Sequence, residues 1–221
     1  FDFIGNSPEI IKIKKTIQKL STAESRVLIT GQTGTGKELL ARKIHKQSSR
    51  SKNPFIIINS ALLQEKKYEK ELFGEEFDDG TVSYGFLEKA NKGTLLLDEV
   101  SEIPLQTQAH ILRVLIDQKF KRINGAKEIN VNIRIISSSS KNLKDLIKKG
   151  DFREDLFHRL NVVPLDLPEL KARTEDIPLL IEYFKKKLSE INGVPEADID
   201  PKNDNLYTYN WPGNIRELRN L

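Results

Sequence analysis

The spacing of apolar residues predicts a helix at the start of the chain, over residues 8–20. Ser7 and Pro8 stand at its beginning, where Ser is a favoured N-cap and Pro suits the first helical position. Its expected buried stripe is a set of aliphatic residues at helical spacing, Ile10, Ile13, Ile17 and Leu20. The chain therefore opens with an amphipathic helix.

Strands and helices then alternate through the first 168 residues. Short apolar runs predict strands at residues 26–30, 55–58, 93–99, 131–137 and 161–165. Helical spacing predicts helices at residues 37–47, 66–73, 105–117 and 142–149. In the helix at 105–117, the residues expected to face inward are Leu105, Ala109, Leu112, Leu115 and Ile116. This alternation predicts an α/β fold with a parallel sheet covered on both faces.

The pattern becomes purely helical after about residue 170. Asp176 is expected to cap a helix that ends at Gly193. Its apolar residues are Ile177, Leu180, Ile181, Phe184, Leu188 and Ile191. We therefore predict two subdomains, an α/β unit over residues 1–168 and a small helical unit over residues 169–221.

Composition narrows the class of protein. The 221 residues are 38% apolar and 31% charged, as in soluble globular proteins. No apolar run is long enough to span a membrane, and there is no Cys, so we expect a cytoplasmic protein without membrane contact. His45, His110 and His158 lack metal-ligand spacing. The net charge of +4 comes from scattered lysines, which we interpret as solvated helix faces. The chain begins without Met, as a fragment of a longer protein would.

A glycine-rich segment between the strand at 26–30 and the next helix predicts a phosphate site. Glycines let several backbone N–H groups face one anion, and the following helix adds the positive end of its dipole. The residues expected to bind nucleotide here are Gly31, Gln32, Thr33, Gly34, Thr35, Gly36, Lys37, Glu38 and Leu39. Lys37 would supply a full charge to the outer phosphates, whereas Glu38 stands where the motif usually has Ser or Thr. The alternative is a flexible glycine turn before a helix.

Two acids at the end of the strand at 93–99 support the nucleotide hypothesis. Ligands of open α/β sheets bind at the carboxyl ends of strands, where Asp98 and Glu99 would lie. Asp98 would hold Mg²⁺, and Glu99 would polarise the water that attacks the γ-phosphate of ATP. A strand that simply ends in solvated acids is the alternative.

Further motifs extend this picture beyond a generic phosphate site. They are Phe3-Ile4-Gly5, Glu71-Leu72-Phe73-Gly74, Phe152-Arg153-Glu154-Asp155-Leu156-Phe157-His158-Arg159-Leu160, Glu175-Asp176-Ile177-Pro178 and Trp211-Pro212-Gly213-Asn214-Ile215-Arg216-Glu217-Leu218. With them, the chain resembles the central AAA+ ATPase domain of bacterial enhancer-binding proteins, the NtrC-type activators of sigma-54 RNA polymerase. In that family Glu follows the P-loop lysine, as Glu38 does here.

The resemblance implies roles for residues outside the phosphate loop. Asn59 matches the asparagine that partners the catalytic glutamate, here Glu99. Arg153 and Arg159 match arginine fingers that enter a neighbouring subunit's site in a hexameric or heptameric ring. Exposed ion pairs with Glu154 and Asp155 are the alternative for both.

Four further positions match residues that bind the nucleotide in the family, Ile4, Gly5, Ser140 and Arg216. Arg216 matches the sensor II arginine, and a helix-surface ion pair is its alternative. The family also implies a receiver domain before this region and a DNA-binding domain after it.

Two departures from the family pattern affect the expected function. The Gly-Ala-Phe-Thr-Gly-Ala loop that touches sigma-54 is absent, and residues 74–85 form a shorter segment. This loss is typical of NtrX-type regulators and argues against contact with sigma-54. Ser139-Ser140 also replaces the usual Thr followed by Asn or His. The hypotheses are therefore a ring-forming ATPase of a two-component regulator, a nucleotide-gated oligomerisation module with little or no ATPase activity, and a AAA+ protein that remodels another partner through Glu75 to Tyr84.

Overall fold

The computed structural model describes the backbone of residues 1–62 and 65–221. The first elements are α1 (Pro8–Leu20), β1 (Val27–Thr30), α2 (Lys37–Lys46), β2 (Phe55–Asn59), η1 (Ser60–Leu62), α3 (Glu65–Phe73), β3 (Glu75–Glu76), β4 (Val82–Ser83), α4 (Phe86–Lys89), β5 (Thr94–Asp98) and η2 (Val100–Glu102). They are followed by α5 (Leu105–Asp117), β6 (Lys119–Lys121), β7 (Glu128–Asn130), β8 (Arg134–Ser139), α6 (Leu143–Lys149), α7 (Glu154–Leu160) and β9 (Val163–Asp166). The chain ends with η3 (Leu170–Ala172), η4 (Thr174–Asp176), α8 (Ile177–Asn192), α9 (Asn205–Thr208) and α10 (Asn214–Arg219).

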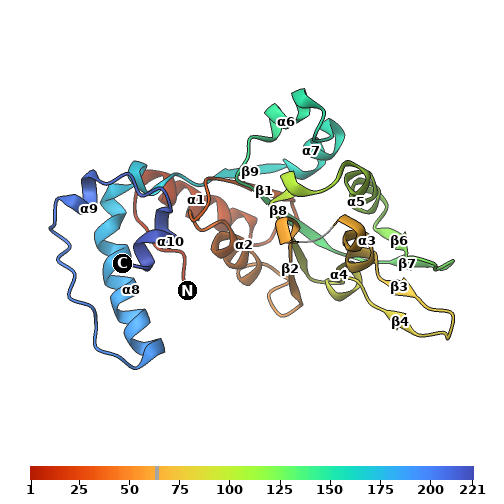
Figure 1. The fold of residues 1–221 in the computed structure, drawn as a ribbon, viewed down its shortest axis with the longest axis horizontal. Coiled ribbons are helices and arrows are strands. Elements are labelled where there is room, and N and C mark those ends of the chain that lie inside the picture. Colours follow the sequence, from red (N-terminus) through yellow and green to blue (C-terminus); the bar gives the residue numbers. More distant parts are fainter. Residues whose placement is uncertain (63–64) are drawn as a thin grey trace.

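A five-stranded parallel sheet with the order β2-β5-β8-β1-β9 forms the centre of the α/β part. β8 lies between β1 and β5, so the carboxyl ends of these three strands meet at one edge of the sheet. The predicted α/β class with a parallel sheet is confirmed. The helical C-terminal part, with α8, α9 and α10, lies at one end of the molecule, opposite the two hairpins β3–β4 and β6–β7 (Figure 1).

Both faces of the sheet are covered, as continuous apolar strands predict. Leu95 and Leu97 of β5 pack in one core cluster with residues of α5 and α7. Leu96, between them, packs in a second cluster with α1 and α2. The predicted stripe of α1 lies in this second cluster and is buried. The sheet is thus a rigid platform whose carboxyl edge carries the polar residues.

The helical C-terminal part has a core of its own. Its buried apolar residues are Leu170, Ile177, Leu180, Ile181, Phe184, Leu206, Trp211 and Leu218. Ile4, from the N-terminal segment, packs against this core. Ile191, the last of the apolar residues of α8, is 60% exposed, because it falls in the last turn, beyond the reach of the core. No helix in the described part of the chain combines the length and apolar character that crossing a bilayer requires.

A buried ion pair joins the N-terminal segment to the start of α8. Arg173 donates from Nε to Asp176 Oδ2 at 2.8 Å, and both side chains are fully buried. Asp176 stands at the N-cap of α8 but makes no capping bond there; its Oδ1 instead accepts from the N–H groups of Asn6 and Ser7. Burial alone would raise the pKa of Asp176, but these hydrogen bonds and Arg173 hold it below its usual range. Ser7 likewise occupies the N-cap of α1 without a side-chain capping bond.

The prediction for α5 was correct for Leu115, which is buried, and for Leu112, which packs against the core, but wrong for Leu105 and Ile116. The buried residues are Thr107, Gln108, Ile111, Val114 and Leu115. Leu105 and Ile116 are 47% and 51% exposed. The buried side of α5 includes a polar residue, Gln108, which is fully buried with hydrogen-bond partners for both ends of its amide. Its Nε2 donates to Ile103 O at 2.8 Å and its Oε1 accepts from Arg153 N.

Strand boundaries near the carboxyl edge also differ from the predictions. β8 spans Arg134–Ser139 rather than residues 131–137, since Ser137, Ser138 and Ser139 all pair with β1, and Ser137 also with β5, despite a modest strand propensity. β9 spans Val163–Asp166 rather than residues 161–165. The hairpins β3–β4 and β6–β7 were not predicted, because strands of two or three residues leave no periodic pattern.

Candidate functional site

The glycine-rich loop turns sharply between β1 and α2. Gly34 and Gly36 have φ of +83° and +101°, in the left-handed region that disfavours side chains. A Cβ at Gly34 would lie 2.2 Å from Gly213 O, so the loop also needs glycine to let the C-terminal part approach. None of the described hydrogen bonds uses the N–H of Gly34, Gly36 or Lys37. These donors, at the start of a helix, are free to bind an anion.

Lys37 lies over this loop with its side chain 7% exposed. Its Nζ donates to Gly31 O at 2.9 Å and to Gln32 O at 3.2 Å, and lies 3.7 Å from Glu99 Oε1. The pKa of Lys37 is lowered, mainly because burial disfavours its charge. The negative charges of Glu99 and Asp98 oppose this shift, and the positive charge of Arg216 adds to it. An anion bound in the loop would oppose the effect of burial and favour the charged ammonium.

The two acids at the end of β5 are held by serines of the neighbouring strand. Ser138 Oγ donates to Asp98 Oδ1 and accepts from Glu99 N at 3.2 Å. Ser140 donates to Glu99 Oε2 from both its N–H, at 3.1 Å, and its Oγ, at 2.9 Å. Glu99 therefore faces Lys37 and the loop with its carboxylate fixed by β8. Sequence reasoning selected Ser140 but missed Ser138, whose only signal was the run of serines in β8.

Asn59 ends β2 beside Asp98 in the strand register. Its Oδ1 accepts from Ala61 N at 3.1 Å, at the start of η1. No hydrogen bond between Asn59 and Glu99 is present among the described residues. Among the described contacts Glu99 is paired with Ser140 and Lys37, and the expected partnership of Asn59 with Glu99 stays a prediction.

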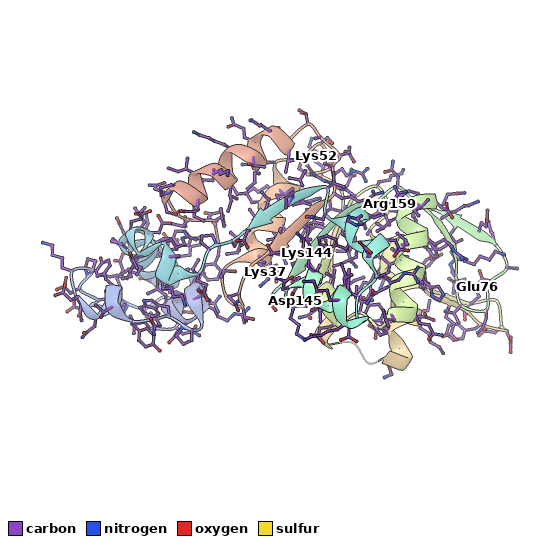
Figure 2. The ribbon with its side chains drawn as sticks, turned by 90° about the horizontal axis from the view of Figure 1, so that it is seen from above. Lys37, Lys52, Glu76, Lys144, Asp145 and Arg159 are labelled. Atoms are coloured by element: carbon purple, nitrogen blue, oxygen red, sulfur yellow. The ribbon has the colours of Figure 1, made fainter. Side chains whose placement is uncertain are left out.

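The loop and the acids border a cleft of about 540 Å³. Its predicted lining residues are Thr33, Gly34, Gly36, Lys37, Glu38, Leu39, Asp98, Glu99 and Arg216. The residues that sequence reasoning missed are Phe1, Arg42, Phe184, Ile215 and Arg219. Figure 2 shows Lys37 between the helical C-terminal part and the sheet. The cleft therefore lies at the junction of the two parts of the chain.

Other predicted site residues lie at the margins of this cleft. Gly31, Gln32 and Ser140 border a neighbouring cleft at the ends of β1, β8 and β9. Thr35 is buried under the loop, where its Oγ1 donates to Gln32 O at 2.7 Å. Glu38, at the rim of the first cleft, is about half exposed and pairs with Arg42 at 2.9 Å.

Ile4 and Gly5 are fixed by contacts away from the loop. Ile4 O accepts from Arg173 and Gly5 O accepts from Lys14, both at 2.6 Å. Both residues border the C-terminal part, and neither lines the cleft beside Lys37. Their predicted contact with nucleotide stays a prediction.

The helical C-terminal part docks directly on the glycine-rich loop. Asn214 is 1% exposed; its Nδ2 donates to Thr33 O at 3.1 Å and its Oδ1 accepts from Leu170 N at 2.8 Å. Arg216 donates from its backbone N–H to Gly34 O at 3.2 Å, and its exposed side chain lines the cleft. Sequence reasoning used Asn214 only as part of a motif and missed this contact.

Replacing Asn214 by alanine is expected to destabilise the protein. The change leaves the buried Leu170 N–H and Thr33 O without partners and puts alanine at a φ of +51°, so the free energy of unfolding should fall by about 2–4 kcal/mol. Urea unfolding measures this loss. Asn220→Ala, an exposed residue at the end of α10, is the matched control and should change stability by less than about 0.5 kcal/mol. Equal stability of the two variants would contradict the docking role of Asn214.

The two predicted arginine fingers lie on or beside α7. Arg153 pairs with Asp155 at 2.9 Å, which is the exposed ion pair considered as the alternative, while its backbone N–H donates to Gln108. Arg159 is exposed. Figure 2 shows Arg159 apart from Lys37, toward the other end of the molecule. Within one chain, therefore, Arg159 is not brought to the cleft.

The residues at the cleft fit a magnesium ion held together with phosphates. Mg²⁺ prefers hard oxygen ligands and usually binds through one or two carboxylates plus phosphates. Asp98 offers its Oδ2, which has no hydrogen bond among the described contacts, at the edge that carries Lys37. No group of three or more His, Asp or Glu in the described chain could hold a metal alone. The site thus suits Mg²⁺ only with a phosphate ligand.

Comparison with known proteins agrees with this geometry. The model of the sigma-54 interaction domain matches residues 3–166, and that of the AAA+ ATPase lid domain matches residues 171–221. The chain belongs to the sigma-54 interaction domain family. Together with the lid match, this makes it an AAA+ domain of the type found in NtrC and NtrX regulators, the resemblance that the sequence motifs predicted.

Relatives in this family are similar over nearly all of the chain. Regulatory protein AtoC of Escherichia coli is 49% identical over 223 residues, covering 99% of this chain and 48% of AtoC. Nitrogen assimilation regulatory protein NtrX of Azorhizobium caulinodans is 42% identical over 219 residues, covering 98% of this chain and 48% of that protein. The crystal structure of NtrX from Brucella abortus in complex with ATP matches with a TM-score of 0.93 and 47% identity, over 100% of this chain and 49% of that one. The chain spans about half the length of these relatives.

Proposed function

We propose that this chain is the ATP-binding and ATP-hydrolysing module of a two-component transcription regulator, located in the cytoplasm. The observation that carries the proposal is the convergence of Lys37, Asp98 and Glu99 on one cleft beside the glycine-rich loop. NtrX of Brucella abortus, similar over the whole chain, has been crystallised with ATP. Binding of DNA would reside in a domain outside these residues.

The proposed roles follow from where each group lies. The loop N–H groups and Lys37 would bind the phosphates, and Arg216 would reach them from the helical C-terminal part. Glu99 would orient and deprotonate the attacking water, since its carboxylate is held toward the loop by Ser140. Asp98 would hold Mg²⁺, which neutralises charge that develops on the phosphate oxygens. ADP would be the product that remains bound.

The missing catalytic charge would come from a second copy of the chain. Arg153 and Arg159 are exposed and lie outside the cleft lined by Lys37. An arginine finger supplied in trans stabilises charge on the transferring phosphate. A hexameric or heptameric ring would place these arginines at a neighbour's site, so the active site would be a property of the assembly.

A second candidate function is a nucleotide-gated oligomerisation module that does not act on sigma-54. The observation that favours it is the short hairpin β3–β4, which replaces the longer loop of the activators. Arg122 pairs with Glu88 at 2.7 Å and with Glu76 at 3.0 Å, so this hairpin is tied to α4 and to the β6–β7 hairpin. Figure 2 places Glu76 far from Lys37. A tied hairpin is poorly suited to movement driven by ATP, although its exposed Phe77 leaves capture of another partner as a third possibility.

Replacing Glu99 by glutamine tests ATP hydrolysis against simple nucleotide gating. Glutamine cannot accept the proton of the attacking water, so turnover should fall at least about 100-fold while ATP stays bound. The measurement is the ratio of ATP to ADP retained on the purified full-length regulator after incubation with ATP. Glu102→Gln, an exposed acid paired with Lys141, is the matched control and should leave the ratio unchanged. If Glu99→Gln also leaves the ratio unchanged, the gating module is favoured.

A further inference from the structure

Strand β8 has a special place at the candidate site. It lies between β1, which leads into the glycine-rich loop, and β5, which ends in the two acids. It ends in Ser137, Ser138 and Ser139, and Ser140 follows it directly. Successive side chains of a strand point to opposite faces, so Ser138 lies on one side of the sheet and Ser137 and Ser139 on the other.

The hydroxyls on the two sides have different partners. Ser137 Oγ is 3.5 Å from Val27 O, and Ser139 Oγ donates to Lys141 O at 2.7 Å, so both serve the backbone. Ser140 holds the carboxylate of Glu99. Ser138, which is fully buried, is bonded to both acids at once, as donor to Asp98 Oδ1 and acceptor from Glu99 N.

Each of the two bonds of Ser138 restrains a group that the proposed reaction needs. Glu99 has φ of +56° and ψ of +59°, a left-handed conformation that is unfavourable for a residue with a side chain. The bond to Ser138 gives its partly buried N–H a partner in that conformation. The bond to Asp98 engages Oδ1 and leaves Oδ2 for another ligand, so the carboxylate cannot rotate freely.

We propose that Ser138 is a positioning residue that fixes Asp98 for Mg²⁺ and holds the backbone of Glu99 in its left-handed turn. The inference rests on the proposed nucleotide function. It adds to the proposed site a residue of β8 that contacts both acids. Outer-shell hydrogen bonds of this kind typically contribute about 10–100-fold to metal affinity. Ser138 is fully buried and lines neither cleft, so it would act through the two acids that it contacts.

The test separates binding that depends on Mg²⁺ from binding that does not. Affinity for ADP and for ATP is measured on the full-length protein by calorimetry, with Mg²⁺ and with a chelator. In Ser138→Ala, the factor by which Mg²⁺ strengthens ATP binding should fall about tenfold, while affinity without Mg²⁺ changes less than about twofold. Ser137→Ala is the matched control, one residue away in the same strand, and should keep the full Mg²⁺ effect.

A second variant, Ser138→Cys, and the wild-type protein are measured in the same way, so that each result either supports or overturns the role of Ser138. Ser138→Cys keeps the size of the side chain with a weaker donor, so it should show a partial loss, and it decides the matter if Ser138→Ala does not fold. An unchanged Mg²⁺ effect in the folded Ser138 variants, or equal losses in the Ser137 and Ser138 variants, overturns the inference. Failure of the wild type to bind nucleotide would instead overturn the proposed function, so the two failures are distinguishable.

Discussion

Replacing Lys37 by alanine is expected to abolish nucleotide binding at micromolar concentrations. The ammonium is a full positive charge held against the glycine-rich loop, where it donates to Gly31 O and Gln32 O. Two charge-assisted hydrogen bonds to phosphate are worth roughly 3 kcal/mol or more, which corresponds to about 100-fold in Kd. Calorimetric titration with ATP measures the loss directly.

The fold of Lys37→Ala should survive, which makes the variant informative. Burial disfavours the charge of Lys37, as the lowered pKa shows, so removing the ammonium removes a cost along with two hydrogen bonds. Lys46→Ala, an exposed lysine in the last turn of the same helix, is the matched control and should bind ATP as the wild type does. Retention of ATP affinity by Lys37→Ala would show that the loop is only a turn before a helix.

The sequence predicted the repeating elements and the sheet class because burial leaves periodic patterns. α1, α2 and β5 were found within a residue, since each has an apolar stripe or run bounded by capping residues or acids. The stripe of α5 was misassigned because a buried Gln108 counts as polar in any pattern of hydrophobicity. Its burial depends on Ile103 and Arg153, which lie beyond the helix, so no local rule could have found it.

The candidate site was predicted where a motif carries the chemistry and missed where packing carries it. Lys37, Asp98 and Glu99 follow from strand-loop-helix and strand-acid patterns, and the structure brings them to one cleft. Ser138 and Asn214 were missed because serine and asparagine are common on surfaces, and only the strand order and the docking of α10 bury them. Asn59 lies beside Asp98 in the strand register, while the hydrogen bonds to the carboxylate of Glu99 come from Ser140, directly after β8.

Docking of the helical C-terminal part gives the nucleotide site a means of signalling. Asn214 and the backbone of Arg216 contact the loop at Thr33 and Gly34, while the side chain of Arg216 lines the cleft. A bound phosphate would attract Arg216 and so change the position of α10 relative to the loop.

ATP turnover per subunit is expected to rise steeply with protein concentration, and Arg153→Ala is expected to remove that rise. The cleft of a single chain has Lys37 and Arg216 but neither Arg153 nor Arg159. If a neighbour supplies an arginine finger, turnover follows the population of assembled subunits, and loss of the finger lowers it about 10³-fold or more. Turnover is measured from submicromolar to high micromolar protein, together with the assembly state by light scattering.

The comparison of variants shows whether Arg153 acts on a neighbour or only pairs with Asp155. Arg113→Ala, an exposed arginine on α5, is the matched control and should keep the concentration dependence. An exposed ion pair such as Arg153–Asp155 contributes little to stability, so Arg153→Ala should remain folded and bind ATP normally. Normal turnover in Arg153→Ala would show that Arg153 serves only in the ion pair with Asp155. If turnover is lost while ATP binding and assembly stay intact, the guanidinium of Arg153 acts in the active site of the neighbouring subunit. Within one chain it does not reach the cleft.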